Sequence, residues 1–77
     1  MNWKDAEKFK EGDVIEFRSK NEDHIRKAEK NGWECFKFIS IGDGGYINTK
    51  KLKNNGQPSE IVTKIYTYNF EYLYKIN

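Results

Sequence analysis

Residues 33–52, WECFKFISIGDGGYINTKKL, predict two strands joined by a tight glycine-rich turn. Phe36 and Phe38 would share one face of the first strand, Trp33–Ile41. The opposite face would carry Trp33, Cys35, Ile39 and Ile41. Apolar residues on both faces indicate a central strand, or a strand bent by a bulge.

The turn of this hairpin is Gly42-Asp43-Gly44-Gly45, whose glycines can supply positive φ angles. The chain then returns as the strand Tyr46–Leu52. Ile47 and Thr49 would lie on one side of it. The other side would hold Tyr46, Asn48 and Lys50.

Two elements are predicted upstream of the hairpin, a strand over Asp13–Arg18 and a helix over Asn21–Asn31. Ile15 and Phe17 would point the same way in the strand. The helix has a cap at Asn21 and a stop at Gly32, and the alternative for this segment is a long ordered loop. Before them, Asn2 could cap a short helix in which Trp3, Ala6 and Phe9 share a face, and the alternative is a packed N-terminal arm.

Downstream, Glu60–Tyr68 is β-branched and aromatic, which favours a strand with Ile61, Thr63 and Ile65 on one face. A strand running unbroken from Glu60 to Ile76 would be too long for so small a domain, so we place a break at Asn69 and a single helical turn over Phe70–Tyr72. Leu73–Ile76 would close the fold as a short strand.

The resulting order over residues 12–77 resembles a small SH3-like barrel with a helix in its first long loop. The resemblance implies an α+β, mainly β fold, either a five-stranded barrel or a strongly curved antiparallel sheet. The acidic peptide-binding loop and paired Trp of signalling SH3 domains are not recognisable, so their binding mode is not expected here.

Size and composition predict a single domain over residues 1–77 in the cytoplasm. A lone cysteine argues against a secreted disulfide framework, and the charged N-terminus does not resemble a signal peptide. No stretch has the length of an apolar membrane span. Abundant Asn, Lys, Ile and Tyr with scarce Pro and Ala are typical of AT-rich genomes, including those of many bacteria and their phages.

The chain lacks the residue patterns of an enzyme, a metal site or a cofactor site. Cys35 falls among aromatic residues that would keep its thiol neutral, and His24 falls in a charged helix. One Cys and one His cannot close a zinc site without carboxylates. The GDGG turn lacks the Lys-Ser/Thr of a phosphate-binding loop, so a hairpin turn is the better interpretation.

Binding surfaces are the remaining candidates. Net charge is only +2, but the region between Asp43 and Glu60 has several lysines and no acid. If the strands at 46–52 and 60–68 lie near each other, lysines and tyrosines share a partner-binding face made of Tyr46, Lys50, Lys51, Lys53, Lys64, Tyr66 and Tyr68. Their inward or outward direction depends on strand register, which a one-residue slip would invert.

Tyrosine is a favoured anchor of protein interfaces, and the tyrosines at 66, 68, 72 and 74 exceed what a small core absorbs. We therefore expect a non-catalytic protein that docks on a protein partner, as a phage- or mobile-element-type modulator or inhibitor does. The alternative is a nucleic-acid-binding domain that uses the same face. A third alternative is self-association through an exposed sheet edge.

Overall fold

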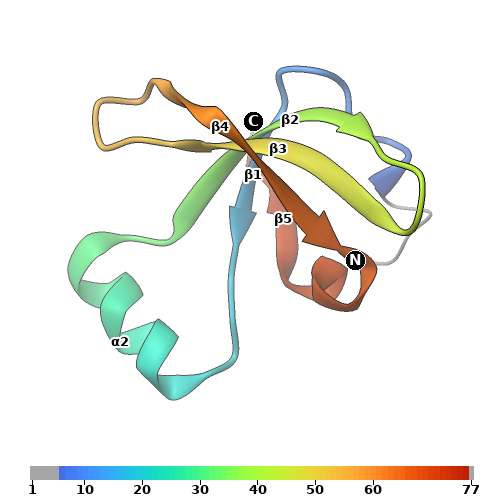
Figure 1. The fold of residues 1–77 in the computed structure, drawn as a ribbon. Helices are drawn as coiled ribbons and strands as arrows, with labels where there is room; N and C mark the ends of the chain where they lie inside the picture. The colour runs from blue at the N-terminus through green and yellow to red at the C-terminus, as the bar shows by residue number, and fades with distance from the viewer. Residues whose placement is uncertain (1–5, 77) are drawn as a thin grey trace.

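A computed structural model describes residues 6–76 of the chain. The elements follow in the order β1 (Val14–Phe17), α2 (Glu22–Asn31), β2 (Glu34–Ile41), β3 (Tyr46–Leu52), β4 (Pro58–Tyr66), the 3-10 helix η1 (Thr67–Tyr72) and β5 (Leu73–Lys75). Figure 1 shows the strands gathered in one sheet, with α2 at one end. The mainly β fold, with one helix inserted after the first strand, is therefore as predicted.

The five strands form one antiparallel sheet in the order β4-β3-β2-β1-β5. Within residues 6–76, β4 and β5 occupy the two edges and do not pair with each other. The sheet is therefore open, and of the two predicted arrangements the antiparallel sheet is formed and the barrel is not. Closure would require β5 to reach β4. Six residues of η1 separate these strands, and β5 is only three residues long.

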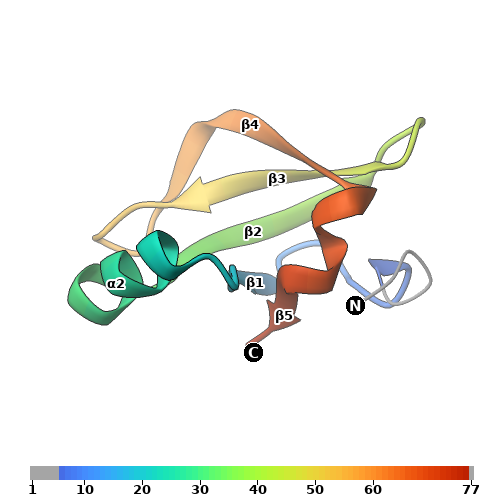
Figure 2. The ribbon, with the colours of Figure 1, turned by 90° about the horizontal axis from the view of Figure 1, so that it is seen from below.

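The helix α2 is capped as predicted, which excludes the ordered-loop alternative. The Asn21 side chain accepts hydrogen bonds from the backbone N–H groups of Asp23 (2.9 Å) and His24 (3.4 Å). At the other end Gly32 has a φ of 83° and donates to the Ala28 carbonyl (2.7 Å). No residue of α2 is buried, and Figure 2 shows the helix beside the sheet. The helix is thus held by its caps and a narrow contact stripe.

The hairpin β2–β3 has the predicted turn and both of the features proposed for its first strand. Gly44 and Gly45 have φ angles of 116° and 79°. A Cβ on Gly42 would lie 2.1 Å from the ring of Tyr46, so only glycine fits there. β2 lies inside the sheet, and its register with β3 shifts between Phe38 and Ser40. This bulge explains why β2 carries apolar residues on both faces.

The core lies on one face of the sheet, which we call the inner face. Its buried apolar residues are Ala6, Phe9, Ile15, Phe36, Phe38, Ile47, Ile65, Phe70 and Leu73. Thr49 is also buried, and Phe17 packs against the cluster. The cap and the first aromatic of the predicted N-terminal helix, Asn2 and Trp3, lie outside the described residues. Ala6 and Phe9 both enter the core, and the Phe9 ring meets Phe38 edge-on at 5.5 Å.

The sequence-based boundaries fail mainly in β4. The strand ends at Tyr66, two residues earlier than predicted, because η1 begins at Thr67. Ile61 was assigned to the face of Ile65, yet 74% of it is exposed. Ile61 lies where the register of β3 with β4 shifts, between the pairs Lys50–Val62 and Leu52–Pro58.

Candidate functional site

Three tyrosines and a lysine meet on the outer face of the sheet, opposite the core. Tyr46 of β3 lies directly across from Tyr66 of β4, and their ring centroids are 5.7 Å apart. The Tyr66 ring stacks nearly parallel on Tyr68 of η1, at 6.1 Å and 10°. The Lys64 Nζ lies 4.8 Å from the centroid of Tyr46. These four residues form what we call the tyrosine face.

The arrangement follows from strand register. Tyr46 and Lys50 alternate with the buried Ile47 and Thr49 along β3, so they point outward as predicted. Residues paired across two strands share a face, which brings Tyr66 beside Tyr46. Tyr68 joins them because the chain turns into η1 immediately after β4.

The predicted lysine cluster is divided by the fold. Lys50 lies opposite Lys37 of β2 on the outer face, next to the tyrosine face. Lys51 points to the other side, where its Nζ forms an ion pair with Glu34 (3.3 Å). Lys53 lies beyond the end of β3, in the β3–β4 connection. Of the seven predicted residues, the five that come together are Tyr46, Lys50, Lys64, Tyr66 and Tyr68.

Two outer-face residues were missed by sequence reasoning. Lys37 pairs with Lys50 in the register, and Val62 lies opposite Lys50 on β4. Lys37 and Val62 each adjoin a buried or half-buried residue of the same strand, so alternation along the strand turns both of them outward. Only the pairing of the strands shows that they adjoin the tyrosine face, and that pairing is a long-range property.

Several side chains of this surface are exposed to solvent. Tyr68 is 77% exposed, Val62 48% and Tyr66 41%, whereas Tyr46 is half-buried beneath its neighbours. Among the described ion pairs, none involves Lys37, Lys50 or Lys64. The outer face at β3 and β4 therefore presents aromatic surface next to uncompensated positive charge.

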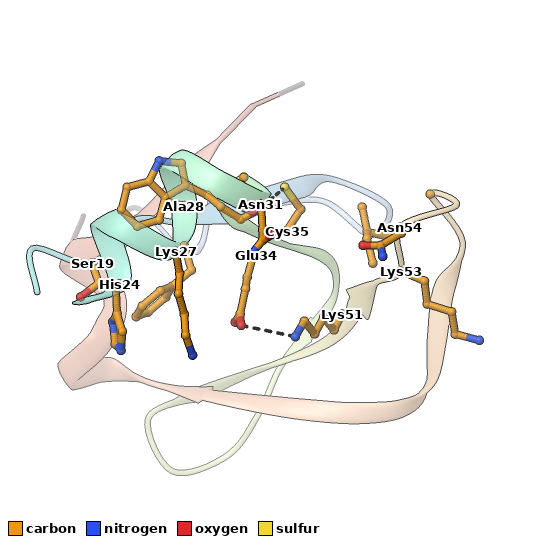
Figure 3. A pocket seen from close by; sticks show the side chains of 15 residues that line it. Ser19, His24, Lys27, Ala28, Asn31, Glu34, Cys35, Lys51, Lys53 and Asn54 are labelled. Carbon is orange, nitrogen blue, oxygen red and sulfur yellow. Dashed lines mark hydrogen bonds and ion pairs between the residues drawn. The ribbon is translucent and has the colours of Figure 1, made fainter. Parts of the chain in front are cut away.

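A hollow lies between α2, the start of β2 and the β3–β4 connection, away from the tyrosine face (Figure 3). Its volume is about 600 Å³. Apolar parts of its wall come from Phe17, Ala28, Trp33 and Leu52, and polar parts include Lys27 and Asn54. The Glu34–Lys51 ion pair lies within it. α2, which has no buried residue, forms one wall of the hollow.

The thiol and the imidazole named in the sequence analysis both line this hollow. Cys35 is half-buried, with its Sγ 3.6 Å from the Trp33 carbonyl and 4.0 Å from the Glu16 carboxylate. Burial raises the pKa of the thiol, and the negative charge of Glu16 raises it further. The Cys35 side chain is therefore a poor nucleophile at neutral pH.

Within residues 6–76, no three His, Cys, Asp or Glu side chains are grouped as metal ligands would be. None of the described helices has the length and apolar character needed to cross a bilayer. Comparison of the chain with protein-family models, curated proteins and solved structures gave no match.

Proposed function

We propose that the protein is a non-catalytic interaction protein that docks on the acidic surface of a protein partner through the tyrosine face. The supporting observation is the exposure of Tyr66 and Tyr68 while the apolar residues of the inner face are buried. Tyrosines with one apolar side and one polar tip are favoured anchors of protein interfaces. Lys37, Lys50 and Lys64 beside them complement acidic side chains of the partner.

The ring geometry favours a protein over a nucleic acid. Base stacking requires an open ring face. One face of Tyr66 is covered by Tyr68 and one face of Tyr46 by the Lys64 ammonium, which leaves Tyr68, 77% exposed, as the ring most open to a base, whereas single-stranded nucleic acid stacks successive bases on several rings. The separation of Lys51 and Lys53 from this surface also shortens the basic track that a phosphate backbone would follow.

The strand order and the short 3-10 helix before β5 support an SH3-like arrangement left open at one side. Residue usage supports the further proposal that docking serves a phage- or mobile-element-type modulator in the cytoplasm. Such a protein would act by steric occlusion, since the tyrosine face offers binding surface and no catalytic group.

The test is a capture experiment from cell lysate with immobilised wild-type protein. The Tyr66→Ala/Tyr68→Ala variant should lose the captured protein by a factor of about 100 or more, because interface anchors contribute about 2 kcal/mol each. Tyr74→Ala is the matched control, since Tyr74 is 46% exposed but lies on β5 at the opposite edge. Equal capture by all three proteins would contradict the proposal.

Salt identifies the class of partner in the same experiment. A protein contact anchored by tyrosines should weaken only modestly between about 0.1 M and about 0.5 M salt, because salt screens the surrounding lysines and not the buried rings, whereas phosphate contacts weaken steeply over this range. Binding of an oligonucleotide that disappears in Lys37→Glu/Lys50→Glu and falls steeply with salt would instead establish the nucleic-acid alternative.

A further inference from the structure

The strand β4 has a free edge in the described sheet. Along a strand, the backbone N–H and C=O groups of alternate residues point to opposite neighbours, and this alternation, here called the backbone phase, shows which residues of β4 point theirs to the free edge. The Gly42 N–H donates to the Tyr46 carbonyl (2.9 Å), so the backbone groups of Tyr46 point toward β2. Residues directly opposite each other in an antiparallel pair share one phase. The backbone groups of Tyr66 therefore point away from β3, and those of Val62 and Lys64 share this phase at two-residue spacing.

The two edges of the sheet differ in their capacity to pair with a further strand. β5 is three residues long, too short to template another strand. β4 is nine residues long and carries the exposed apolar residues Ile61 (74%) and Val62 (48%). Its only proline, Pro58, is the first residue of the strand, where a missing N–H interrupts little pairing. The ammonium of Lys64 lies over the Tyr46 ring on the β3 side, so it does not block the open edge, and the side chain must turn toward that edge to pair with an acid across it.

We propose that two copies of this chain join through β4, antiparallel and centred on Val62. In this register Val62 of one copy lies opposite Val62 of the other. Glu60 of each copy lies opposite Lys64 of the other, which makes two pairs of opposite charge. Other symmetric registers that use the same backbone groups are less favourable: centring on Glu60 or on Lys64 opposes like charges, and centring on Thr63 places Val62 opposite Lys64 and Glu60 opposite Tyr66, which makes neither charge pair. Cross-strand pairs of opposite charge stabilise a sheet, and directly opposed like charges destabilise it.

The consequence is a continuous sheet built from two five-stranded halves. The two-fold axis of an antiparallel strand pair runs perpendicular to the sheet, so both outer faces lie on the same side. Two tyrosine faces would then stand side by side on one surface. The dimer does not depend on the docking function, because it forms without any other protein.

Sedimentation of the purified full chain at increasing concentration, up to about 1 mM, tests the proposal. Wild-type protein should dimerise, and Glu60→Lys or Lys64→Glu should each weaken the dimer about tenfold, because each creates two like-charge contacts. The Glu60→Lys/Lys64→Glu double variant should restore dimerisation, since the charges are exchanged and still complementary. Lys30→Glu on α2 is the control and should leave the dimer unchanged.

Hydrogen exchange locates the contact. The amides of Val62 and Lys64 should become slower to exchange as concentration rises, while that of Tyr74 on β5 should not change. Three results would overturn the proposal: a protein that stays monomeric throughout, a dimer insensitive to both single charge changes, or a double variant no better than the singles.

Discussion

The two faces of β3 and β4 are built from alternating residues of the same strands and have opposite characters. On the inner face Ile47 and Thr49 are inaccessible to solvent, and Ile65 is 6% exposed. On the outer face Tyr66 is 41% exposed and lies among lysines. Burial of apolar surface supplies stability, so the inner face accounts for the fold and leaves the outer face available for recognition. Substitutions should therefore affect one property or the other according to face.

The largest expected effect is on the inner side, at Phe70 of η1. This ring is 1% exposed and packs in the core. Phe70→Ala should lower the free energy of unfolding by about 3–5 kcal/mol, which is most of the stability expected of a chain this size. Urea denaturation followed by circular dichroism measures it. Glu71→Ala, at the exposed neighbouring residue, should change stability by less than about 0.5 kcal/mol. Equal effects of the two substitutions would show that η1 does not hold the core.

A smaller effect is expected from the one buried polar side chain described. The Thr49 hydroxyl donates to the Thr63 carbonyl (2.8 Å), which connects β3 and β4 through a side chain as well as the backbone. Thr49→Val should cost about 1 kcal/mol because the hydrogen bond is lost at nearly unchanged volume. Thr63→Val is the control, since the accepting group is its backbone carbonyl. An unfolding midpoint for Thr49→Val equal to that of wild type would contradict the role of the hydroxyl.

On the outer face the expected changes in stability are smaller still. Lys64→Gln removes the ammonium from the Tyr46 ring, and such exposed cation–π contacts contribute about 0.5–1 kcal/mol. Lys50→Gln removes a charge from the same face without that contact. The difference between the unfolding free energies of the two variants measures the ring contact. If Lys64→Gln lost about 2 kcal/mol or more, as a truncation in the core does, the outer face would contribute to stability as much as the inner face, and the distinction between the two faces would be wrong.

The smallest effect is expected at Asp13, where acid should weaken the junction of β1 and β5. The backbone N–H of Lys10 donates to the Asp13 carboxylate (2.8 Å) and lowers the pKa of Asp13 from the ordinary 3.8. Partial burial of the carboxylate opposes this lowering, and the Lys75 ammonium at 3.4 Å strengthens it. A carboxyl group whose pKa is lower in the folded protein than in the unfolded chain stabilises the fold at every pH above the unfolded-state pKa. This stabilisation is lost as the pH falls through the pKa of the folded protein.

Asp13→Asn should therefore be less stable than wild type at pH 7, and the two unfolding midpoints should converge as the solution is acidified below pH 3.8. Asp43→Asn in the exposed turn is the control and should track wild type throughout. A constant difference between Asp13→Asn and wild type at every pH would rule out the carboxylate as its cause.

Local sequence signals predicted much of the fold. Asn21 and Gly32 fixed the ends of α2, and the alternation around Phe36 and Ile47 identified the inner face, because capping and strand alternation depend only on neighbouring residues. The exposure of Ile61 could not be predicted from strand alternation, because it depends on where the core ends beneath the sheet and on the pairing of β3 with β4, which shifts at this point. Whether the sheet closes is likewise decided by how far β5 reaches after η1, which is a tertiary property.

The candidate site was predicted in part for the same reason. Tyr46, Lys64 and Tyr66 were placed together because both strands alternate regularly up to the turn. Lys51 and Lys53 were adjacent in sequence to Lys50 but are separated from it by alternation and by the end of β3. Lys37 reaches the surface through β2, a neighbour that only the sheet order reveals.

The most direct test of the division between the faces uses two consecutive residues of β4, Ile65 and Tyr66. Stability by urea denaturation and capture of the partner are measured for both alanine variants. Ile65→Ala should lose about 2–5 kcal/mol of stability, whereas Tyr66→Ala should stay within about 1 kcal/mol of wild type and capture far less partner. A Tyr66→Ala variant that is as destabilised as Ile65→Ala, or that captures as well as wild type, would contradict the account.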